Sequence, residues 1–176
     1  MADLYTYLIA SLPMLHFGMK PPFSFERFLE ICRPLIPTED FQLLRALPQP
    51  EQYFTKGRRP RIIRKWIGFD VALRNELVKI RATRKHVEPA TYLRPEGSSS
   101  SSLAPAIVAA TINTSVLERE KALDETRWKA LDELATGHYF DLDFLITYAY
   151  KLSILERWEK IHNADRTILL KQALQH

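Results

Sequence analysis

Apolar residues along most of the chain recur at every third or fourth position, whereas the alternation typical of β-strands is scarce. The clearest stripe lies in residues 62–80, where its members lie on one face of a helix. This stripe comprises Ile62, Trp66, Phe69, Leu73, Leu77 and Ile80. With only five glycines in 176 residues, the pattern predicts an all-α protein, an antiparallel bundle of six to eight helices.

Capping residues and prolines predict where the helices of the first half begin. The apolar opening, "MADLYTYLIASLPML", is expected to be the first element of the fold. Ser24 is expected to cap the next helix and Thr38 a short one after it, since both side chains can accept an N-terminal amide. A long helical block is expected from about Pro60 to Lys85, with Gly68 weakening its middle.

A Gly/Ser tract divides the chain. The stretch "RPEGSSSSS" cannot bury apolar surface, so residues 95–102 are expected to form a mobile loop. The loop separates an N-terminal helical part, 1–94, from a C-terminal helical part, 103–176, and the two are expected to pack as one compact domain. Three more helices are expected, at about 115–136, 142–162 and 164–174.

Positive charge is concentrated in one segment. Residues 56–85 hold eleven Lys or Arg and two acids, a net charge of +9, whereas the whole chain carries +4. The alternatives are a nucleic-acid surface, a solvated helix face, and a face that meets an acidic protein. Because no helix-turn-helix, zinc-finger or RNA-binding motif accompanies the charge, a protein partner is favoured over nucleic acid.

The sequence contains no recognisable catalytic or cofactor motif. Its five histidines are scattered, and phosphate-binding glycine loops and nucleophile elbows are absent. Cys32 lies among apolar residues and is interpreted as a buried thiol rather than a nucleophile. Asp141 and Asp143 could be a carboxylate pair, but the favoured interpretation is a helix cap. We therefore expect no enzyme, cofactor, metal or small-molecule substrate.

Two charged helical stretches are interpreted as solvated amphipathic surface, "LERE" at 117–120 and "LDETRWKALDE" at 123–133. The longest uncharged apolar run, "LAPAIVAATI", has about half of the roughly 20 residues that a membrane span needs. No membrane crossing is therefore expected.

Three polar residues interrupt the apolar stripe of the long helical block. Asp70 and Arg74 are spaced i, i+4 and can form an ion pair on the helix. Asn75 is a poor residue for the middle of a helix, and it is expected to bind the backbone of a neighbouring loop. Because partly buried polar groups usually satisfy one another, Asp70, Arg74 and Asn75 are predicted to form a structural polar clamp.

Two segments resemble a known family. The helix "GFDVALRNELVKIRATRKHV" is similar to one in the C subunit of V/A-type ATPases (the d subunit in eukaryotes), and "YLRPEG" at 92–97 resembles the segment that follows it. The stretch "YFDLDFLITYAYKLSILERWEKIH", at 139–162, resembles a late helix of that family. The chain's opening resembles short bacterial proteins of unassigned function encoded with V-type ATPase genes. The matching helix positions are Asp70, Asn75, Ile80, Arg81 and Arg84.

The resemblance implies one lobe of the ATPase's C subunit and a non-catalytic role. The protein would couple or dock the central rotor stalk to the membrane ring for ion transport, and it would be cytoplasmic and attached to the membrane only through these partners. The alternatives are an assembly factor of the ATPase and a basic nucleic-acid-binding module. The expected docking residues are Arg58, Arg59, Arg61, Arg64, Lys65, Arg81, Arg84 and Lys85.

Overall fold

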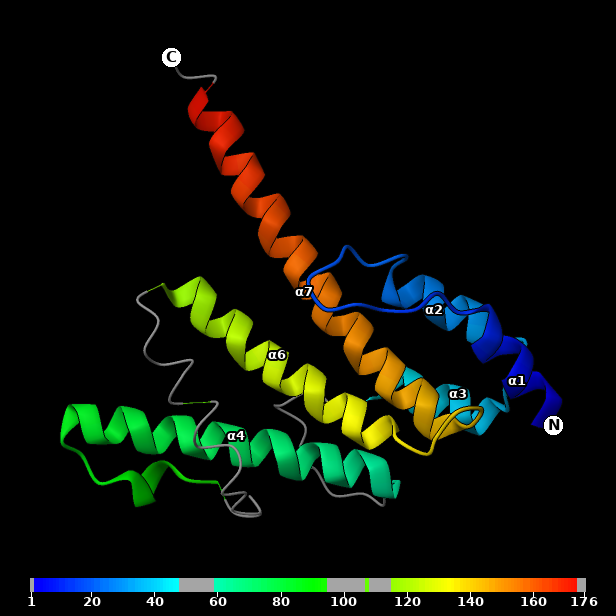
Figure 1. Ribbon diagram of the computed structural model, residues 1–176, viewed down its shortest axis with the longest axis horizontal. Helices are drawn as coiled ribbons and strands as arrows, with labels where there is room; N and C mark the ends of the chain where they lie inside the picture. The colour runs from blue at the N-terminus through cyan, green and yellow to red at the C-terminus, as the bar shows by residue number, and fades with distance from the viewer. Residues whose placement is uncertain (1, 48–58, 95–106, 108–114, 174–176) are drawn as a thin grey trace. The chain divides into compact units, whose positions relative to one another are not determined.

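The protein is all-α, as the periodicity predicts (Figure 1). The computed structural model holds six α-helices and one short 3₁₀ helix within the residues that it describes. The structure describes residues 2–47, 59–94, 107 and 115–173. At positions 2, 3 and 165–173 it describes the backbone but not the side chains.

The chain is divided into two compact units. Residues 1–47 and 135–176 form the first unit, and residues 48–134 form the second. This grouping differs from the expected division at 95–102, a tract that lies outside the described residues. The expected boundary followed local composition, whereas compact units follow contacts between helices that are distant in the sequence.

The first unit comprises α1 (Ala2–Ser11), α2 (Phe25–Cys32), α3 (Thr38–Arg45) and α7 (Leu142–Ala173). Helices α2 and α3 contact each other and α7. The ring of Phe28 stacks on that of Tyr148 with centroids 5.4 Å apart, and the Tyr148 hydroxyl donates a hydrogen bond of 2.9 Å to the Pro13 carbonyl. The buried Tyr148 side chain therefore anchors the loop that follows α1 onto helix α7.

Side chains satisfy the N-terminal amides of α2 and α7. Ser24 accepts a hydrogen bond from the Arg27 amide at 3.1 Å, and the Glu156 carboxylate accepts one from the Phe25 amide at 2.8 Å. Asp141 accepts one from the Phe144 amide at 2.9 Å. The predicted caps at Ser24 and Asp141 are thus confirmed, but Thr38 is the first residue of α3 and Pro37 precedes it as the cap position.

The expected break near residue 163 is wrong, because α7 runs without interruption from Leu142 to Ala173. Asn163 is a weak helix former, but no proline or glycine lies near it to end the helix. Its amide group reaches back one turn and donates to Glu159 at 3.3 Å. A single low-propensity residue is therefore tolerated within a long helix.

The second unit contains α4 (Arg61–Lys85), η2 (Pro89–Tyr92) and α6 (Val116–Ala135) as far as residue 134. Side chains from α4, Ile107 and α6 form its apolar core. Helix α4 passes through Gly68 unbroken and ends at Lys85; the next residue, His86, caps it in a left-handed conformation with φ of 52°. The fully or largely buried core residues are Ala72, Leu73, Ile107 and Leu123, against which Phe69, Leu77, Ile80 and Ala122 pack.

None of the helices within the described residues is both long enough and apolar enough to cross a membrane.

Two glycines are expected to respond to alanine in opposite directions. A Cβ at Gly68 would meet no atom within 4 Å and would sit in helical backbone, so Gly68→Ala should raise the free energy of unfolding by about 0.5–1 kcal/mol. Gly137 has φ of +86°, so Gly137→Ala should lower it by about 1–2 kcal/mol. Urea titration of each variant checks both signs. Equal effects of the two substitutions would contradict this account.

Candidate functional site

A network of charged side chains joins α4 to α6. The two carboxylate oxygens of Asp70 accept from Arg74 and from Arg127, in each case through Nε at 2.8 Å. Arg127 also donates through Nη1 to Asp124 at 2.9 Å. The network holds two carboxylates and two guanidiniums, so its formal charge is zero.

Asp70 lies in this network at 1% exposure. Burial by itself raises the pKa of a carboxyl, but the charge and hydrogen bond of Arg127, followed by those of Arg74, outweigh it and lower the pKa of Asp70. Asp70 is therefore ionised at neutral pH. A buried anion of this kind is stable only while its cationic partners stay in place.

Asn75 holds the chain that follows η2. Its side-chain amide donates to the Arg94 carbonyl at 2.9 Å, and its carbonyl oxygen accepts from the Arg94 amide at 3.0 Å. The pair of bonds ties residue 94 to α4. Of the predicted polar clamp, the structure joins Asp70 to Arg74 and places Asn75 on this separate backbone contact.

The sequence interpretation of residues 123–133 as solvated amphipathic surface is wrong for two of the charged residues. Asp124 is 0% exposed and the Arg127 side chain is only 12% exposed. Both lie on the face of α6 that also carries the buried residues Leu123 and Trp128. The i, i+3 spacing of Asp124 and Arg127 beside those apolar residues was a signal in the sequence that both could be buried. The pattern within α6 could not reveal that Arg127 also binds Asp70 of α4.

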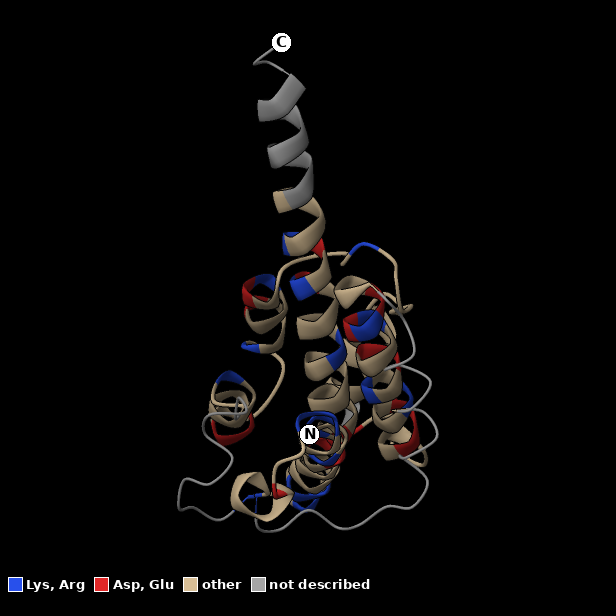
Figure 2. Cartoon of the chain, turned by 90° about the vertical axis from the view of Figure 1, so that its left-hand side faces the viewer, with Lys and Arg blue, Asp and Glu red and all other residues tan. Residues whose placement is uncertain are grey.

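The cations of α4 fall into two groups along the helix. Figure 2 shows the described Lys and Arg residues in blue. Near the middle, Arg74 pairs with Asp70, and Lys79 pairs with Glu76 at 2.6 Å. Toward the two ends, five exposed cations form no ion pair with any described residue. Arg59 is half-buried and Arg84 exposed, whereas Arg58 lies outside the described residues. The unpaired group comprises Arg61, Arg64, Lys65, Arg81 and Lys85.

The cations at the start of α4 oppose the helix dipole. The first turn of α4 holds no acid and contains Arg61 and Arg64. The N-terminal end of a helix carries a partial positive charge, so cations there cost rather than contribute helix stability. Arg84 and Lys85, in the last turn, are favourably placed for the dipole. Arg61 and Arg64 therefore gain no stabilisation from the helix dipole.

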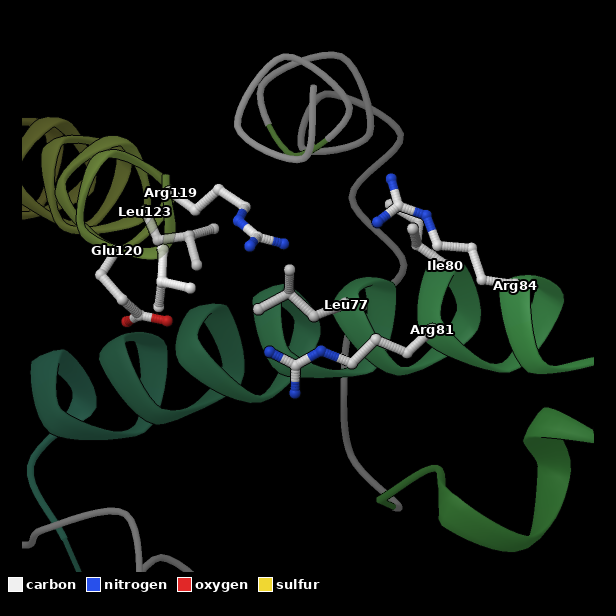
Figure 3. A pocket seen from close by; sticks show the side chains of 8 residues that line it. Leu77, Ile80, Arg81, Arg84, Arg119, Glu120 and Leu123 are labelled. Atoms are coloured by element: carbon white, nitrogen blue, oxygen red, sulfur yellow. The ribbon is translucent and has the colours of Figure 1, made fainter. Parts of the chain in front are cut away.

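A pocket of about 250 Å³ lies between the last turns of α4 and the first turns of α6, all within the second unit. Its apolar wall continues the core of that unit, since Leu77, Ile80 and Leu123 belong to both. Figure 3 shows the Arg119 guanidinium extending from α6 toward Leu77 and the Glu120 carboxylate reaching toward α4. The lining residues are Leu77, Ile80, Arg81, Arg84, Val116, Arg119, Glu120 and Leu123.

The pocket brings together two predicted docking residues and two that the sequence interpretation missed. Arg81 and Arg84 were expected to contact a partner, whereas Arg119 and Glu120 were interpreted as solvated surface. Both are half-buried in the pocket wall, which corrects that interpretation. The structure does not gather Arg61, Arg64 or Lys65 into this pocket.

Reactive side chains in the first unit occupy structural positions. Cys32 is fully buried, and this burial raises the pKa of its thiol to about 12, so it stays protonated at neutral pH. His138 Nδ1 lies 2.7 Å from Asp141 and Nε2 lies 3.8 Å from Asp143. Among the residues with described positions, no group of three or more His, Cys, Asp or Glu is arranged to hold a metal ion.

A family model described as a protein of unknown function (DUF2764) matches residues 103–174, which is less than half of the chain. The matched range includes all of α6 and α7, and therefore Arg127 and one wall of the pocket. No curated protein and no solved structure matches the chain.

The two arginines that contact Asp70 are expected to differ in their contribution to stability. Removing the largely buried Arg127 would leave Asp70 and Asp124 without their shared partner, so Arg127→Ala should cost about 3–5 kcal/mol. The Arg74 side chain is 38% exposed, and Arg74→Ala should cost about 1 kcal/mol or less. Native-state hydrogen exchange of the α4 and α6 amides measures both. Equal losses would contradict the assignment of Arg127 as the central partner.

Acid should weaken the second unit through Asp70. Because the folded-state pKa of Asp70 lies below its usual value of about 3.9, its ionised form stabilises the fold above that pH. This contribution is lost as pH falls below about 4 toward the folded-state pKa. The difference in unfolding free energy between the wild type and Asp70→Asn should therefore be constant above about pH 5 and shrink at pH 3. A difference that grows in acid would show that the pKa is raised instead.

Proposed function

We propose that this protein is a non-catalytic docking protein that couples the central rotor stalk of a V-type ATPase to its membrane ring for ion transport. The observation that carries the proposal is the set of five exposed cations on α4 that no described acid neutralises. Unpaired charge at both ends of one rigid helix suits a surface that meets an acidic partner.

The cost of these cations within the fold supports a binding role. Arg61 and Arg64 lie where the helix dipole disfavours positive charge. Residues that break a local rule without a compensating contact are expected at functional positions. An acidic partner would supply the missing compensation, because opposite charges brought together across an interface guide association.

The identity of the partner follows from the sequence resemblance to the C subunit of V/A-type ATPases. The resemblance includes Asp70 and Asn75, which hold α4 to the rest of the second unit, and Arg81 and Arg84, which line the pocket. On this proposal the protein works on the cytoplasmic face of the membrane and attaches to it through the proteins of the stalk and ring.

A nucleic-acid-binding module is the second candidate, and the same exposed cations favour it. Phosphate contacts release counterions, so such binding falls steeply with salt. A titration of DNA and RNA binding against salt concentration therefore separates the two candidates.

Co-purification from native membranes tests the proposal. Tagged protein should retain the ATPase stalk and ring at low ionic strength. A triple variant, Arg61→Glu with Arg64→Glu and Lys65→Glu, should retain much less, because it reverses the unpaired charge at the start of α4. An intact, active ATPase complex that lacks this protein would refute the proposal.

A matched control separates charge at the docking surface from total charge. Arg27→Glu, Arg33→Glu and Arg45→Glu change the net charge by the same amount at exposed positions of the first unit. This variant should retain the ATPase nearly as well as the wild type. Equal losses in both variants would mean that net charge, rather than the α4 surface, governs retention.

A further inference from the structure

The pocket in the second unit is bounded by two helix faces with the same spacing. Helix α4 contributes positions 77, 80, 81 and 84, and α6 contributes positions 116, 119, 120 and 123. Both sets follow the i, i+3, i+4, i+7 pattern, which is one face of a helix over two turns. The pocket is therefore a short groove between two helix faces (Figure 3).

We propose that this groove binds an acidic amphipathic helix of a partner protein, with one apolar side chain of that helix inserted between Leu77 and Val116. The proposal rests on the proposed docking function and names the site and the kind of segment that would occupy it. Amphipathic helices bind grooves of this type through apolar anchors spaced at helical intervals.

The lining of the groove suits an apolar anchor side chain. The groove measures about 250 Å³, just below the range of about 300–1,000 Å³ that is usual for small-molecule pockets. Its apolar wall is formed by Leu77, Ile80 and Leu123, which belong to the core of the unit. Apolar side chains inserted into such pockets dominate the affinity of protein interfaces.

The charges at the groove favour an acidic partner. Three guanidiniums and one carboxylate line it, and Arg81 forms no ion pair with any described residue. The chain's own segment 103–114 contains no Asp or Glu, so it cannot supply the carboxylates. Guanidinium groups pair with carboxylates through two parallel hydrogen bonds, which adds orientation as well as affinity.

Glu120 sets a limit on the partner. It makes no ion pair with the described part of the chain and reaches toward α4 (Figure 3). A carboxylate placed against it would be repelled, whereas one placed against Arg81 or Arg119 would be attracted. The bound helix is therefore expected to place its acids beside the arginines and to avoid an acid at Glu120.

Peptide binding to the full-length protein tests the proposal. The probe, the Glu peptide, is a fluorescent helical peptide of Ala, Leu and Glu with Leu on one face and Glu beside it. A second peptide, the Lys peptide, has Lys at each Glu position. Fluorescence anisotropy should show saturable binding of the Glu peptide. Arg119→Glu and Arg81→Glu should each weaken this binding at least about tenfold, which is a loss of about 1.4 kcal/mol or more in binding free energy. Arg119→Glu should gain affinity for the Lys peptide. Because residue 119 lies in the first turns of α6, a glutamate there suits the helix dipole and should not unfold the protein.

Two further variants separate the apolar anchor from the charges. Val116 is 68% exposed, so Val116→Trp should fill the mouth of the groove without disturbing the core and should weaken the Glu peptide at least about tenfold. Lys121→Glu is the matched control, because it changes the charge by the same amount at an exposed position of α6 that does not line the groove. Its effect on binding should stay below about twofold.

Several outcomes would overturn the proposal. These are an absence of saturable binding at low salt, equal binding of the Lys peptide, and an effect of Lys121→Glu as large as that of Arg81→Glu. Displacement of the peptide by a single-stranded oligonucleotide or by anionic lipid vesicles, equally in the wild type and in Val116→Trp, would mean that general electrostatic attraction accounts for binding.

The same variants distinguish this proposal from the docking function. Retention of the ATPase by Val116→Trp and Arg119→Glu at the wild-type level would overturn the groove proposal and leave the docking function standing. Binding of the Glu peptide with the expected variant effects, but no retention of the ATPase, would support the groove and overturn the ATPase as partner. Photo-cross-linking from position 116 in cells should then identify an acidic helical segment, and a cross-linked segment without acids would contradict the proposal.

Discussion

The buried charge of Asp70 constrains how α4 and α6 pack against each other in the second unit. An ionised carboxylate at 1% exposure needs cationic partners in fixed positions. Arg74 comes from its own helix, but Arg127 comes from α6 and binds Asp124 as well. The two helices can shift past each other only by breaking these bonds. The network thus fixes their register, although apolar burial around Leu73 and Leu123 supplies the main attraction between them.

This register also determines what the surface presents. Fixing α4 against α6 places four residues of each helix around one small groove and leaves Arg81, Arg119 and Glu120 at its walls. The internal network uses its arginines to neutralise buried acids. Five exposed cations toward the ends of α4 form no ion pair with any described residue, namely Arg61, Arg64, Lys65, Arg81 and Lys85. The unit therefore has a neutral interior contact and an electropositive outer surface, an arrangement suited to docking an acidic protein.

Local physical chemistry made several features predictable. The caps at Ser24 and Asp141 depend on one side chain and an amide nearby in the sequence. The pairing of Asp70 with Arg74 depends on helical spacing alone. By contrast, Arg127 is separated from Asp70 by 57 positions. No periodic pattern could relate them, and "LDETRWKALDE" has the composition of an ordinary solvated helix.

The sequence by itself determined the helical class, most helix boundaries and the concentration of positive charge on α4, because each arises from propensity, spacing or composition within one segment. Only the tertiary structure decided which charges are internal and which face outward, how the chain is grouped into two units, and that Arg119 and Glu120 line a groove with Arg81. These properties depend on which helix faces meet. That pairing is decided by contacts between residues distant in the chain, and a single sequence does not record them.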